Sequence, residues 1–157
     1  GEISVWFAFG PMAILIATVG QNLELHPLVW LLMPVTGLST SSILLAGQMI
    51  DLDADRDGGK HGVALRMGTR FTSVLYILVQ SGIIVNVILL FIFFPGHSWL
   101  FLFALIPYIF IFPKAASIIY KNHDNPDILK KGAKLTVLTH LAFSLLLIFG
   151  FLIYIYL

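Results

Sequence analysis

Long apolar stretches alternate with short polar segments along the whole chain of 157 residues. Five stretches are apolar over most of their length: about 3–20, 28–50, 71–94, 99–120 and 135–157. A helix needs roughly 20 predominantly apolar residues to cross the hydrocarbon core of a bilayer. The last four stretches reach this length and the first is close to it. The pattern therefore predicts an all-α membrane protein with five transmembrane helices.

The composition agrees with this class. The chain is 59% hydrophobic and only 11% charged, which is more apolar than a soluble domain requires. It contains no cysteine, so disulfides and thiolate metal ligands are excluded. The net charge is +1 and no basic stripe is interleaved with aromatic residues, which argues against nucleic acid as a partner. We treat residues 1–157 as a single transmembrane domain.

The positions of the basic residues orient the predicted bundle. All nine Lys and Arg residues fall within 51–70 or 114–134, while the connections 21–27 and 95–98 contain none. Two spans separate the basic regions, so both lie on one side of the membrane. By the positive-inside rule that side is cytoplasmic.

Polar residues also occur within the predicted spans. Residues 39–42 form a polar run in the second span, and Gln80 and Asn86 lie in the third. A polar group in hydrocarbon must find hydrogen-bond partners, so we interpret these residues mainly as helix-packing contacts, with cavity lining as the alternative. Four prolines within the spans predict kinks: Pro11, Pro34, Pro107 and Pro113.

The segment 51–70 holds eight of the seventeen charged residues. Asp51 and Asp55 are four residues apart, which on a helix continuing from the second span places both carboxylates on one face. Asp53 and Asp57 repeat the spacing on another face. Neighbouring carboxylates repel each other unless a cation lies between them. Carboxylates without Cys or His nearby suit Mg²⁺ or Ca²⁺.

Gly58 and Gly59 are expected to end this helix, and the cations Lys60, Arg66 and Arg70 follow. Acidic ligands for a metal beside cations for an anion are what a magnesium-complexed diphosphate requires. The alternative is a solvated helix face without a ligand.

Two other motifs fit these residues less well. Asp53-x-Asp55-x-Asp57-Gly58 matches the first half of an EF-hand loop, but Ala64 stands where a bidentate Glu is required. The membrane phosphotransferase pattern D-G-x-x-A-R, followed by a later Asp pair, fails after Asp57-Gly58 because the Ala-Arg and the pair are both absent.

The string DLDADRDGGKHGVALRMG resembles the second aspartate-rich motif of the UbiA-type intramembrane prenyltransferases. The opening GEISVWFAFGP and the segment Ala133-Lys134-Leu135 resemble segments of the menaquinone branch, the 1,4-dihydroxy-2-naphthoate prenyltransferases. Seven residues fall on the motif in register: Asp51, Asp55, Gly59, Lys60, Ala64, Arg66 and Gly68. The resemblance implies a bundle of nine transmembrane helices, of which this chain supplies the five C-terminal ones, with the active site on the cytoplasmic side.

This chain departs from the family's pattern in three places. Gly47 and Gln48 replace an Asn-Asn pair common in the menaquinone branch, and residues 61–63 replace Arg-Thr-Leu. Both changes affect the expected acceptor, so hydroxybenzoate, homogentisate, a haem and a glycerol phosphate stay as alternatives. The family's first motif, N-x-x-x-D-x-x-x-D, does not occur in this chain. We therefore expect it to be the C-terminal half of a longer protein and to be inactive alone.

The resemblance also implies roles for individual residues in the transfer of a polyprenyl group from its diphosphate to an aromatic acceptor in quinone biosynthesis. Asp51 and Asp55 are the implied catalytic metal ligands for Mg²⁺, with Asp57 as a further ligand or neighbour. Lys60 and Arg66 would bind diphosphate oxygens. Arg56 and Arg70 are weaker candidates for the same role, with membrane anchoring as the alternative, and Gln48 is the candidate for the acceptor pocket.

A second hypothesis comes from a different class of protein. The chain could be a non-catalytic membrane bundle, half of a transporter or a scaffold, whose acidic loop binds an ion. An inverted repeat would favour a transporter, but no second copy of the acidic loop is present.

Overall fold

The computed structural model describes residues 1–157 except 22–23, 26, 95–96 and 157, so the end of the predicted span 135–157 lies outside the described residues. Every regular element in these ranges is a helix. In chain order they are α1 (Glu2–Phe7), η1 (Ala8–Met12), α2 (Ala13–Gly20), α3 (Pro27–Ile50), α4 (Leu52–Asp57), α5 (Val63–Phe93), η2 (His97–Leu105), α6 (Ile106–Phe110), α7 (Phe112–Lys121) and α8 (Pro126–Tyr156).

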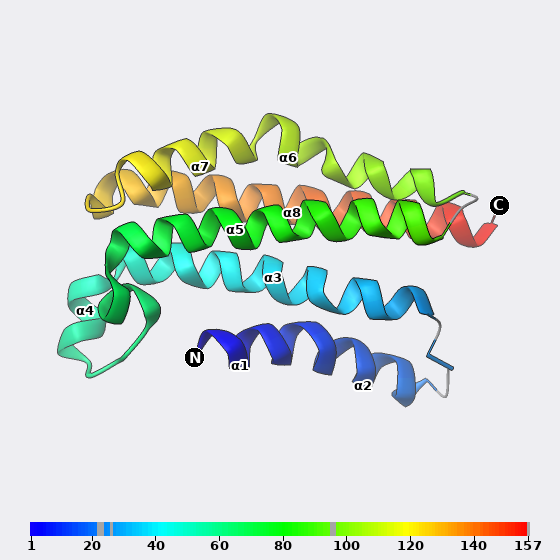
Figure 1. Cartoon of the computed structure of the whole chain (residues 1–157), viewed down its shortest axis with the longest axis horizontal. Coiled ribbons are helices and arrows are strands. Elements are labelled where there is room, and N and C mark those ends of the chain that lie inside the picture. The colour runs from blue at the N-terminus through cyan, green and yellow to red at the C-terminus, as the bar shows by residue number, and fades with distance from the viewer. Residues whose placement is uncertain (22–23, 26, 95–96, 157) are drawn as a thin grey trace.

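The long helices run side by side and roughly parallel (Figure 1). Among the described residues, four segments are long and apolar enough to cross a membrane: Glu2–Gly20, Pro27–Ile50, Val63–Phe93 and Pro126–Tyr154. A bent pair, Ser98–Phe110 and Phe112–Lys121, makes a fifth if its two parts form one span. The predicted all-α membrane fold is confirmed.

Two membrane helices start earlier in the chain than their apolar stretches do. Helix α5 begins at Val63 and α8 at Pro126, whereas the apolar stretches begin near 71 and 135. A helix continues past the hydrocarbon as long as its backbone hydrogen bonds are favourable, so polar residues extend it into the interface. Residues 63–70 of the acidic segment therefore belong to helix α5.

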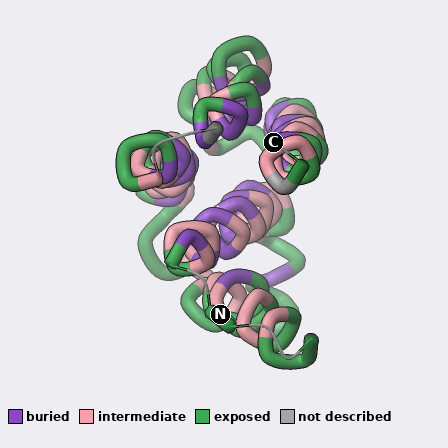
Figure 2. Tube along the Cα trace, turned by 90° about the vertical axis from the view of Figure 1, so that its right-hand side faces the viewer, coloured by how far each residue is buried: buried purple, intermediate pink, exposed green. Residues whose placement is uncertain are grey.

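Helix α3 forms the centre of the bundle. Figure 2 shows it with buried residues along its length, with α1–α2 on one side and α5 and α8 flanking it on the other. Helices α1 and α2 have no buried residue, and this rod packs on α3 through both α1 and the π-helical segment η1. A side-chain carbon on Gly10 would lie 2.6 Å from the Met33 carbonyl oxygen. Glycine at position 10 thus permits the close approach of the two rods.

Polar side chains connect the helices inside the bundle. The Tyr108 hydroxyl donates to Gln80 Oε1 (2.8 Å), which links α6 to α5, and the hydroxyls of Tyr76 and Thr136 lie 2.7 Å apart between α5 and α8. Ser39 bonds His140 between α3 and α8. Ser39 and Gln80 thus bond to neighbouring helices, as the packing interpretation predicted. Thr40, Ser42 and Asn86 instead donate to backbone carbonyls of their own helices. The buried Ser41 hydroxyl has no hydrogen-bond partner among the described residues.

The fourth predicted span is irregular. It consists of the 3₁₀ helix η2 followed by α6 and α7, and its two parts meet at 40°. Pro107 and Pro113 lie near the starts of α6 and α7, where the missing backbone N–H costs no hydrogen bond. These prolines therefore divide the span into segments, while Pro34 lies inside the continuous helix α3.

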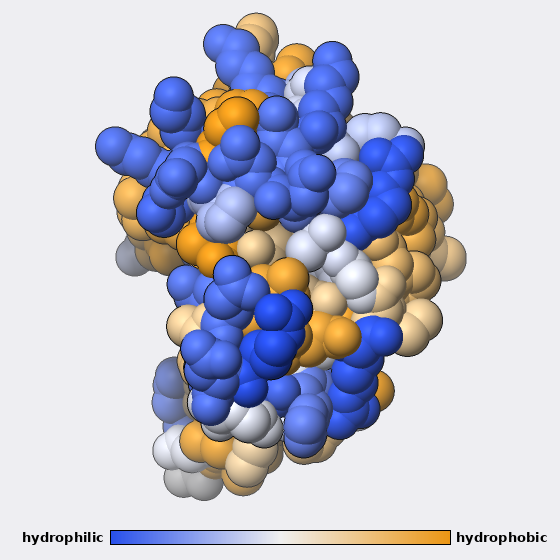
Figure 3. All heavy atoms as spheres, turned by 90° about the vertical axis from the view of Figure 1, so that its left-hand side faces the viewer, coloured by the Kyte–Doolittle hydropathy of each residue, from blue (hydrophilic) through white to orange (hydrophobic). Residues whose placement is uncertain are grey.

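The two basic connections lie at the same end of the bundle, as the sequence predicted. Figure 1 places α4 and the α7–α8 connection together at one end, and Figure 3 shows hydrophilic residues gathered there. Hydrogen bonds join the two regions: Thr69 Oγ1 lies 3.1 Å from His123 Nδ1, and Arg70 Nη2 donates to the Tyr120 hydroxyl at 2.6 Å. The cytoplasmic location of this end remains a prediction.

Candidate functional site

The acidic segment begins at a break between two helices. Helix α3 ends at Ile50, Asp51 has φ −94° and ψ 20°, and α4 starts at Leu52. The sequence predicted an unbroken helix here, and this detail is wrong. The Asp55 amide nevertheless donates to the Asp51 carbonyl at 2.8 Å, so the four-residue spacing still follows one helical turn.

The chain reverses after α4 and returns Lys60 to Asp55. Helix α4 ends at Asp57, Gly58 caps it, and Gly59 has a φ of 67°, a conformation that glycine adopts readily. The Lys60 amide donates to the Asp55 carbonyl at 2.9 Å, and its ammonium lies 2.6 Å from Asp55 Oδ1. The predicted glycine break is confirmed.

This ion pair is asymmetric in its exposure. The Asp55 side chain is 12% exposed and the Lys60 side chain 69%. The hydrogen bond and charge of Asp55 raise the pKa of the Lys60 ammonium, and the negative charge of Asp51 adds to this effect. Lys60 therefore stays positively charged well above neutral pH, and it lies within electrostatic reach of both carboxylates.

The start of α5 is held by side chains from two other helices. Glu2 Oε1 accepts hydrogen bonds from Gln48 Nε2 (2.7 Å) and from the Val63 amide (3.0 Å), and Gln48 Oε1 accepts one from the Ala64 amide (3.4 Å). The first backbone amides of a helix have no intrahelical partner, so these side chains satisfy two of them. Glu2 and Gln48 thus join α1, α3 and α5.

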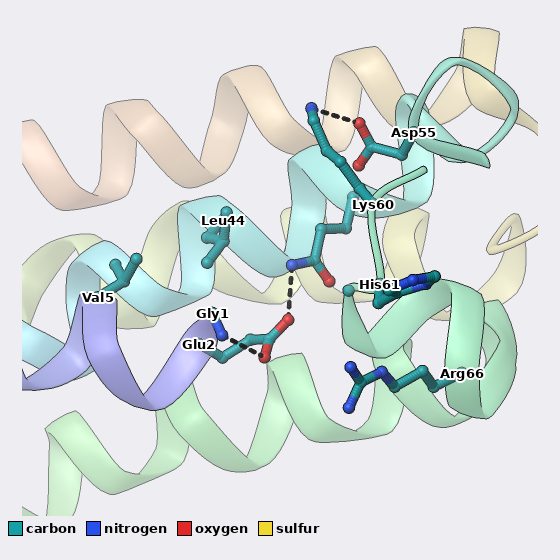
Figure 4. A pocket seen from close by; sticks show the side chains of 10 residues that line it. Gly1, Glu2, Val5, Leu44, Asp55, Lys60, His61 and Arg66 are labelled. Atoms are coloured by element: carbon teal, nitrogen blue, oxygen red, sulfur yellow. Dashed lines mark hydrogen bonds and ion pairs between the residues drawn. The ribbon is translucent and has the colours of Figure 1, made fainter. Parts of the chain in front are cut away.

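A cavity of about 410 Å³ lies between these elements. It has a polar side and an apolar side, and Figure 4 shows the side chains around it. The lining residues are Gly1, Glu2, Val5, Leu44, Gln48, Asp55, Lys60, His61, Gly62 and Arg66.

Four of the residues predicted from the sequence line this cavity together: Gln48, Asp55, Lys60 and Arg66. The Arg66 guanidinium extends into the open space between Glu2 and His61 (Figure 4), and its side chain has no hydrogen bond or ion pair with the described residues. Asp51 is exposed beside the cavity, where its charge acts on Lys60.

Three other predicted residues lie outside the cavity lining. Arg56 forms an exposed ion pair with Asp53 at 3.0 Å. Arg70 stacks on Tyr120, with its guanidinium carbon 4.0 Å from the ring centre. Asp57 is exposed at the end of α4. The geometry thus separates Lys60 and Arg66, which line the cavity, from Arg56 and Arg70, which have protein partners elsewhere.

The sequence reasoning did not identify Glu2 as part of the site. An acidic residue at the edge of an apolar span is a recognised sign of a functional or buried polar group, and that signal was available. Its partners could not be foreseen, because Gln48 and Val63 are 46 and 61 residues away in the chain. His61, for which the sequence favoured a solvent-facing loop position over contact with substrate, also lines the cavity.

The donor set of the site fits a hard cation in combination with a substrate. Within the described residues no group of three or more His, Cys, Asp and Glu side chains is close enough to hold a metal alone. Mg²⁺ is commonly bound through one or two carboxylates together with substrate phosphates and water. Asp51 and Asp55 supply such carboxylates, so they fit Mg²⁺ when a diphosphate is bound.

Comparison with known proteins gives partial matches. Over 91 residues the chain is 32% identical to "1,4-dihydroxy-2-naphthoate octaprenyltransferase" of Mycobacterium leprae (strain TN), which covers 57% of this chain and 31% of that protein. It is 33% identical over 78 residues to "UbiA prenyltransferase domain-containing protein 1" of Homo sapiens, covering 48% of this chain and 22% of that protein. The matches thus span about a third of these relatives or less.

No solved structure matches the chain. The sequence profile of the UbiA prenyltransferase family matches residues 1–138, which include the acidic segment and every residue of the cavity. The chain therefore belongs to the UbiA prenyltransferase family.

Proposed function

We propose that this chain forms the diphosphate-binding half of a prenyltransferase that moves a polyprenyl group from its diphosphate to an aromatic acceptor in quinone biosynthesis. One observation carries the proposal: a single cavity, at the polar end of an apolar bundle, is lined by the carboxylate Asp55 and the cations Lys60 and Arg66. Membership of the family supports the reaction class.

The cations are assigned to the diphosphate. Lys60 lies beside Asp55 with most of its side chain exposed, so it can contact a phosphate oxygen without leaving the carboxylate. Arg66 faces the cavity without a protein partner among the described residues, and a guanidinium binds two oxygens of one phosphate well. Together they would neutralise part of the charge that develops on the leaving group.

Asp51 and Asp55 would hold Mg²⁺ for the diphosphate. When bound, the ion would supply Lewis-acid stabilisation of the leaving diphosphate. Asp57 is a more distant candidate because it is exposed and does not line the cavity. Asp55 Oδ1 already binds Lys60. The lysine thus fixes the orientation of the carboxylate, and the other carboxylate oxygen would be the one that binds the metal.

The acceptor is proposed to be a hydroxylated aromatic ring. The Mycobacterium leprae relative is named for 1,4-dihydroxy-2-naphthoate, and the cavity has an apolar wall, Val5 and Leu44, beside the amide of Gln48. Gln48 is also held between Glu2 and the start of α5, so it fixes the shape of this wall even where it does not touch the acceptor.

We propose that activity needs the remainder of a longer protein. This chain carries the cations that would bind the diphosphate, Lys60 and Arg66, and the carboxylates Asp51 and Asp55. The carboxylates of the family's first aspartate-rich motif, in the other half, would complete the metal sites. The isolated chain should insert into membranes without transferring prenyl groups. Joining it to the half that carries N-x-x-x-D-x-x-x-D should give activity.

The test is a prenyl-transfer assay on the complete protein with single carboxylate variants. Asp51→Asn and Asp55→Asn should lower the rate by about 10²-fold or more, because each removes charge facing the metal. Asp53→Asn is the matched control, since Asp53 pairs with Arg56 on the exposed face, and it should keep most of the activity. Equal loss in all three variants would remove the basis for assigning Asp51 and Asp55.

A further inference from the structure

Glu2 differs from the other acidic residues of the chain in both position and contacts. Its side chain is 24% exposed, and it lies at the start of α1, away from the Asp55–Lys60 pair and on the side of the cavity that Arg66 faces (Figure 4). Among the carboxylates of the cavity lining, Asp55 is paired with Lys60. Glu2 has no Lys or Arg partner among the described residues, and its ion pair is with the Gly1 ammonium at 3.9 Å.

The two oxygens of Glu2 have different environments. Oε1 accepts both hydrogen bonds, from Gln48 Nε2 at 2.7 Å and from the Val63 amide at 3.0 Å. Oε2 accepts none from the described residues, and its contact with the Gly1 nitrogen, at 3.9 Å, is longer than a hydrogen bond. The first oxygen thus fixes the carboxylate in place and leaves the second free to accept a proton.

Apolar surface lies next to this carboxylate on both sides. Val5 and Leu44 line the same cavity, and Glu2 also lines an adjoining apolar cleft of about 200 Å³ between α1, α3 and α5. That cleft is lined by Glu2, Ile3, Trp6, Leu38, Ser41, Leu45, Leu75 and Val79. An aromatic ring with a hydroxyl group can place the ring against such a wall and the hydroxyl at the carboxylate.

We propose that Glu2 is a catalytic residue that binds the hydroxyl group of the aromatic acceptor and accepts its proton through Oε2. The inference rests on the proposed prenyl transfer and adds the acceptor side of the same site. A diphosphate would avoid Glu2 because like charges repel, so the cavity has one side for each substrate.

The proposed step balances in atoms and electrons. The acceptor O–H proton moves to Glu2 Oε2 while a ring carbon forms a bond to the allylic carbon of the prenyl diphosphate. The C–O bond to the diphosphate breaks, and its electron pair leaves with the diphosphate. The substituted ring carbon then loses its proton to solvent and the ring becomes aromatic again. The product oxygen takes the proton back from Glu2 Oε2, so the carboxylate is restored and the net loss is one ring proton.

The experiment measures the kinetics of Glu2→Gln in the complete protein. An amide oxygen can still accept from Gln48 and Val63, so Glu2→Gln keeps the contacts of Oε1 and loses only the ability to take a proton. We expect kcat/KM for the acceptor to fall by about 10²- to 10⁴-fold, the usual contribution of a general base. The affinity for prenyl diphosphate should stay within about twofold of the wild type, since Lys60 and Arg66 are unchanged.

A second readout separates proton transfer from a purely structural role. An acceptor analogue with a more acidic hydroxyl group is partly ionised before it binds, so it should recover part of the rate lost in Glu2→Gln. Glu24→Gln is the matched control. It makes the same substitution at an exposed residue outside the cavity lining, and it should leave the rate unchanged.

The outcomes distinguish this inference from the function on which it rests. If the wild type neither binds prenyl diphosphate nor transfers the prenyl group, the proposed function itself fails. If the wild type is active and Glu2→Gln keeps its acceptor kcat/KM, the assignment of Glu2 as a base is overturned. Loss of prenyl diphosphate affinity in Glu2→Gln would overturn it as well, because Glu2 would then be a structural support of α5.

Discussion

Arg70 and Tyr120 form a stacked and hydrogen-bonded pair that joins the start of α5 to the end of α7. The guanidinium carbon lies 4.0 Å from the ring centre, and Nη2 donates to the Tyr120 hydroxyl at 2.6 Å. The pair gives Arg70 a structural partner, whereas Arg66, four residues earlier and before the break at Gly68, faces the cavity. Two arginines of similar sequence context thus have different expected roles.

Arg70→Ala should therefore affect stability more than substrate affinity. Loss of a cation–π contact at an exposed site costs about 0.5–1 kcal/mol, and the lost hydrogen bond adds to this. We expect a lower midpoint of thermal unfolding in detergent, with affinity for prenyl diphosphate near the wild-type value. Tyr120→Phe is the control that keeps the stacking and removes only the hydroxyl. A large loss of affinity in Arg70→Ala with unchanged unfolding would assign Arg70 to the diphosphate.

The backbone conformation of Gly68 also positions the start of α5. Its φ of 83° and ψ of 160° interrupt α5, and this region is accessible almost only to glycine. Gly68→Ala should cost about 1–3 kcal/mol in unfolding free energy, although a side-chain carbon there would meet no atom within 4 Å. The measurement is the unfolding midpoint.

Gly47→Ala is the matched control for this prediction. Gly47 lies inside α3, and a side-chain carbon there also has no neighbour within 4 Å. Alanine is the better helix former by roughly 0.5–1 kcal/mol, so this variant should be neutral or more stable. If both variants lose the same amount of unfolding free energy, the backbone conformation at position 68 does not explain why glycine is needed there.

The buried contact between Tyr108 and Gln80 should contribute modestly to stability. Tyr108→Phe removes the hydroxyl that donates to Gln80 Oε1 at 2.8 Å without changing the packed ring. Hydrogen bonds between membrane helices average about 0.6 kcal/mol and reach about 1.7 kcal/mol, and the loss should fall in this range. A double-mutant cycle with Gln80→Leu gives the coupling free energy between Tyr108 and Gln80. A value near zero would show that their hydrogen bond does not contribute to stability.

The sidedness of the polar end can be measured by accessibility labelling. The chain has no cysteine, so single cysteines can be introduced at Lys60, Lys131 and Glu24, all exposed. The first two should react with a membrane-impermeant thiol reagent from the cytoplasmic side, and Glu24→Cys only from the opposite side. Labelling of positions 60 and 131 from opposite sides would contradict both the topology and the site.

The sequence predicted the membrane class and the polar end because both depend on long patterns. Twenty apolar residues in a row have few structural alternatives, and the basic residues cluster in two segments separated by two spans. The glycine break before Lys60 was predictable for a similar reason, because Gly58 and Gly59 cannot extend a helix favourably.

Other features depend on contacts between distant residues and could not be predicted. The hydrogen bonds of Glu2 to Gln48 and Val63 exist only after α1, α3 and α5 pack together. The separation of Arg66 from Arg70 likewise depends on the non-helical turn at Gly68 and on Tyr120, which lies 50 residues away. Helix ends were misplaced because polar residues can continue a membrane helix into the interface.

Binding of prenyl diphosphate tests the central claim most directly, since it requires the cations and the carboxylates to act on one ligand. The measurement is the Kd of the complete protein for prenyl diphosphate, with and without Mg²⁺, for the wild type, Lys60→Ala and Arg66→Ala. Arg56→Ala is the matched control, because it also removes a cation from this segment. Arg56 pairs with the exposed Asp53 and does not line the cavity.

A charge-assisted hydrogen bond contributes roughly 1.5–3 kcal/mol, so each of the two cavity variants should bind prenyl diphosphate about ten- to a hundredfold more weakly. Arg56→Ala should bind like the wild type, and removal of Mg²⁺ should weaken binding in every protein. Affinity that is unchanged in both cavity variants and independent of Mg²⁺ would contradict the account and favour a non-catalytic membrane bundle.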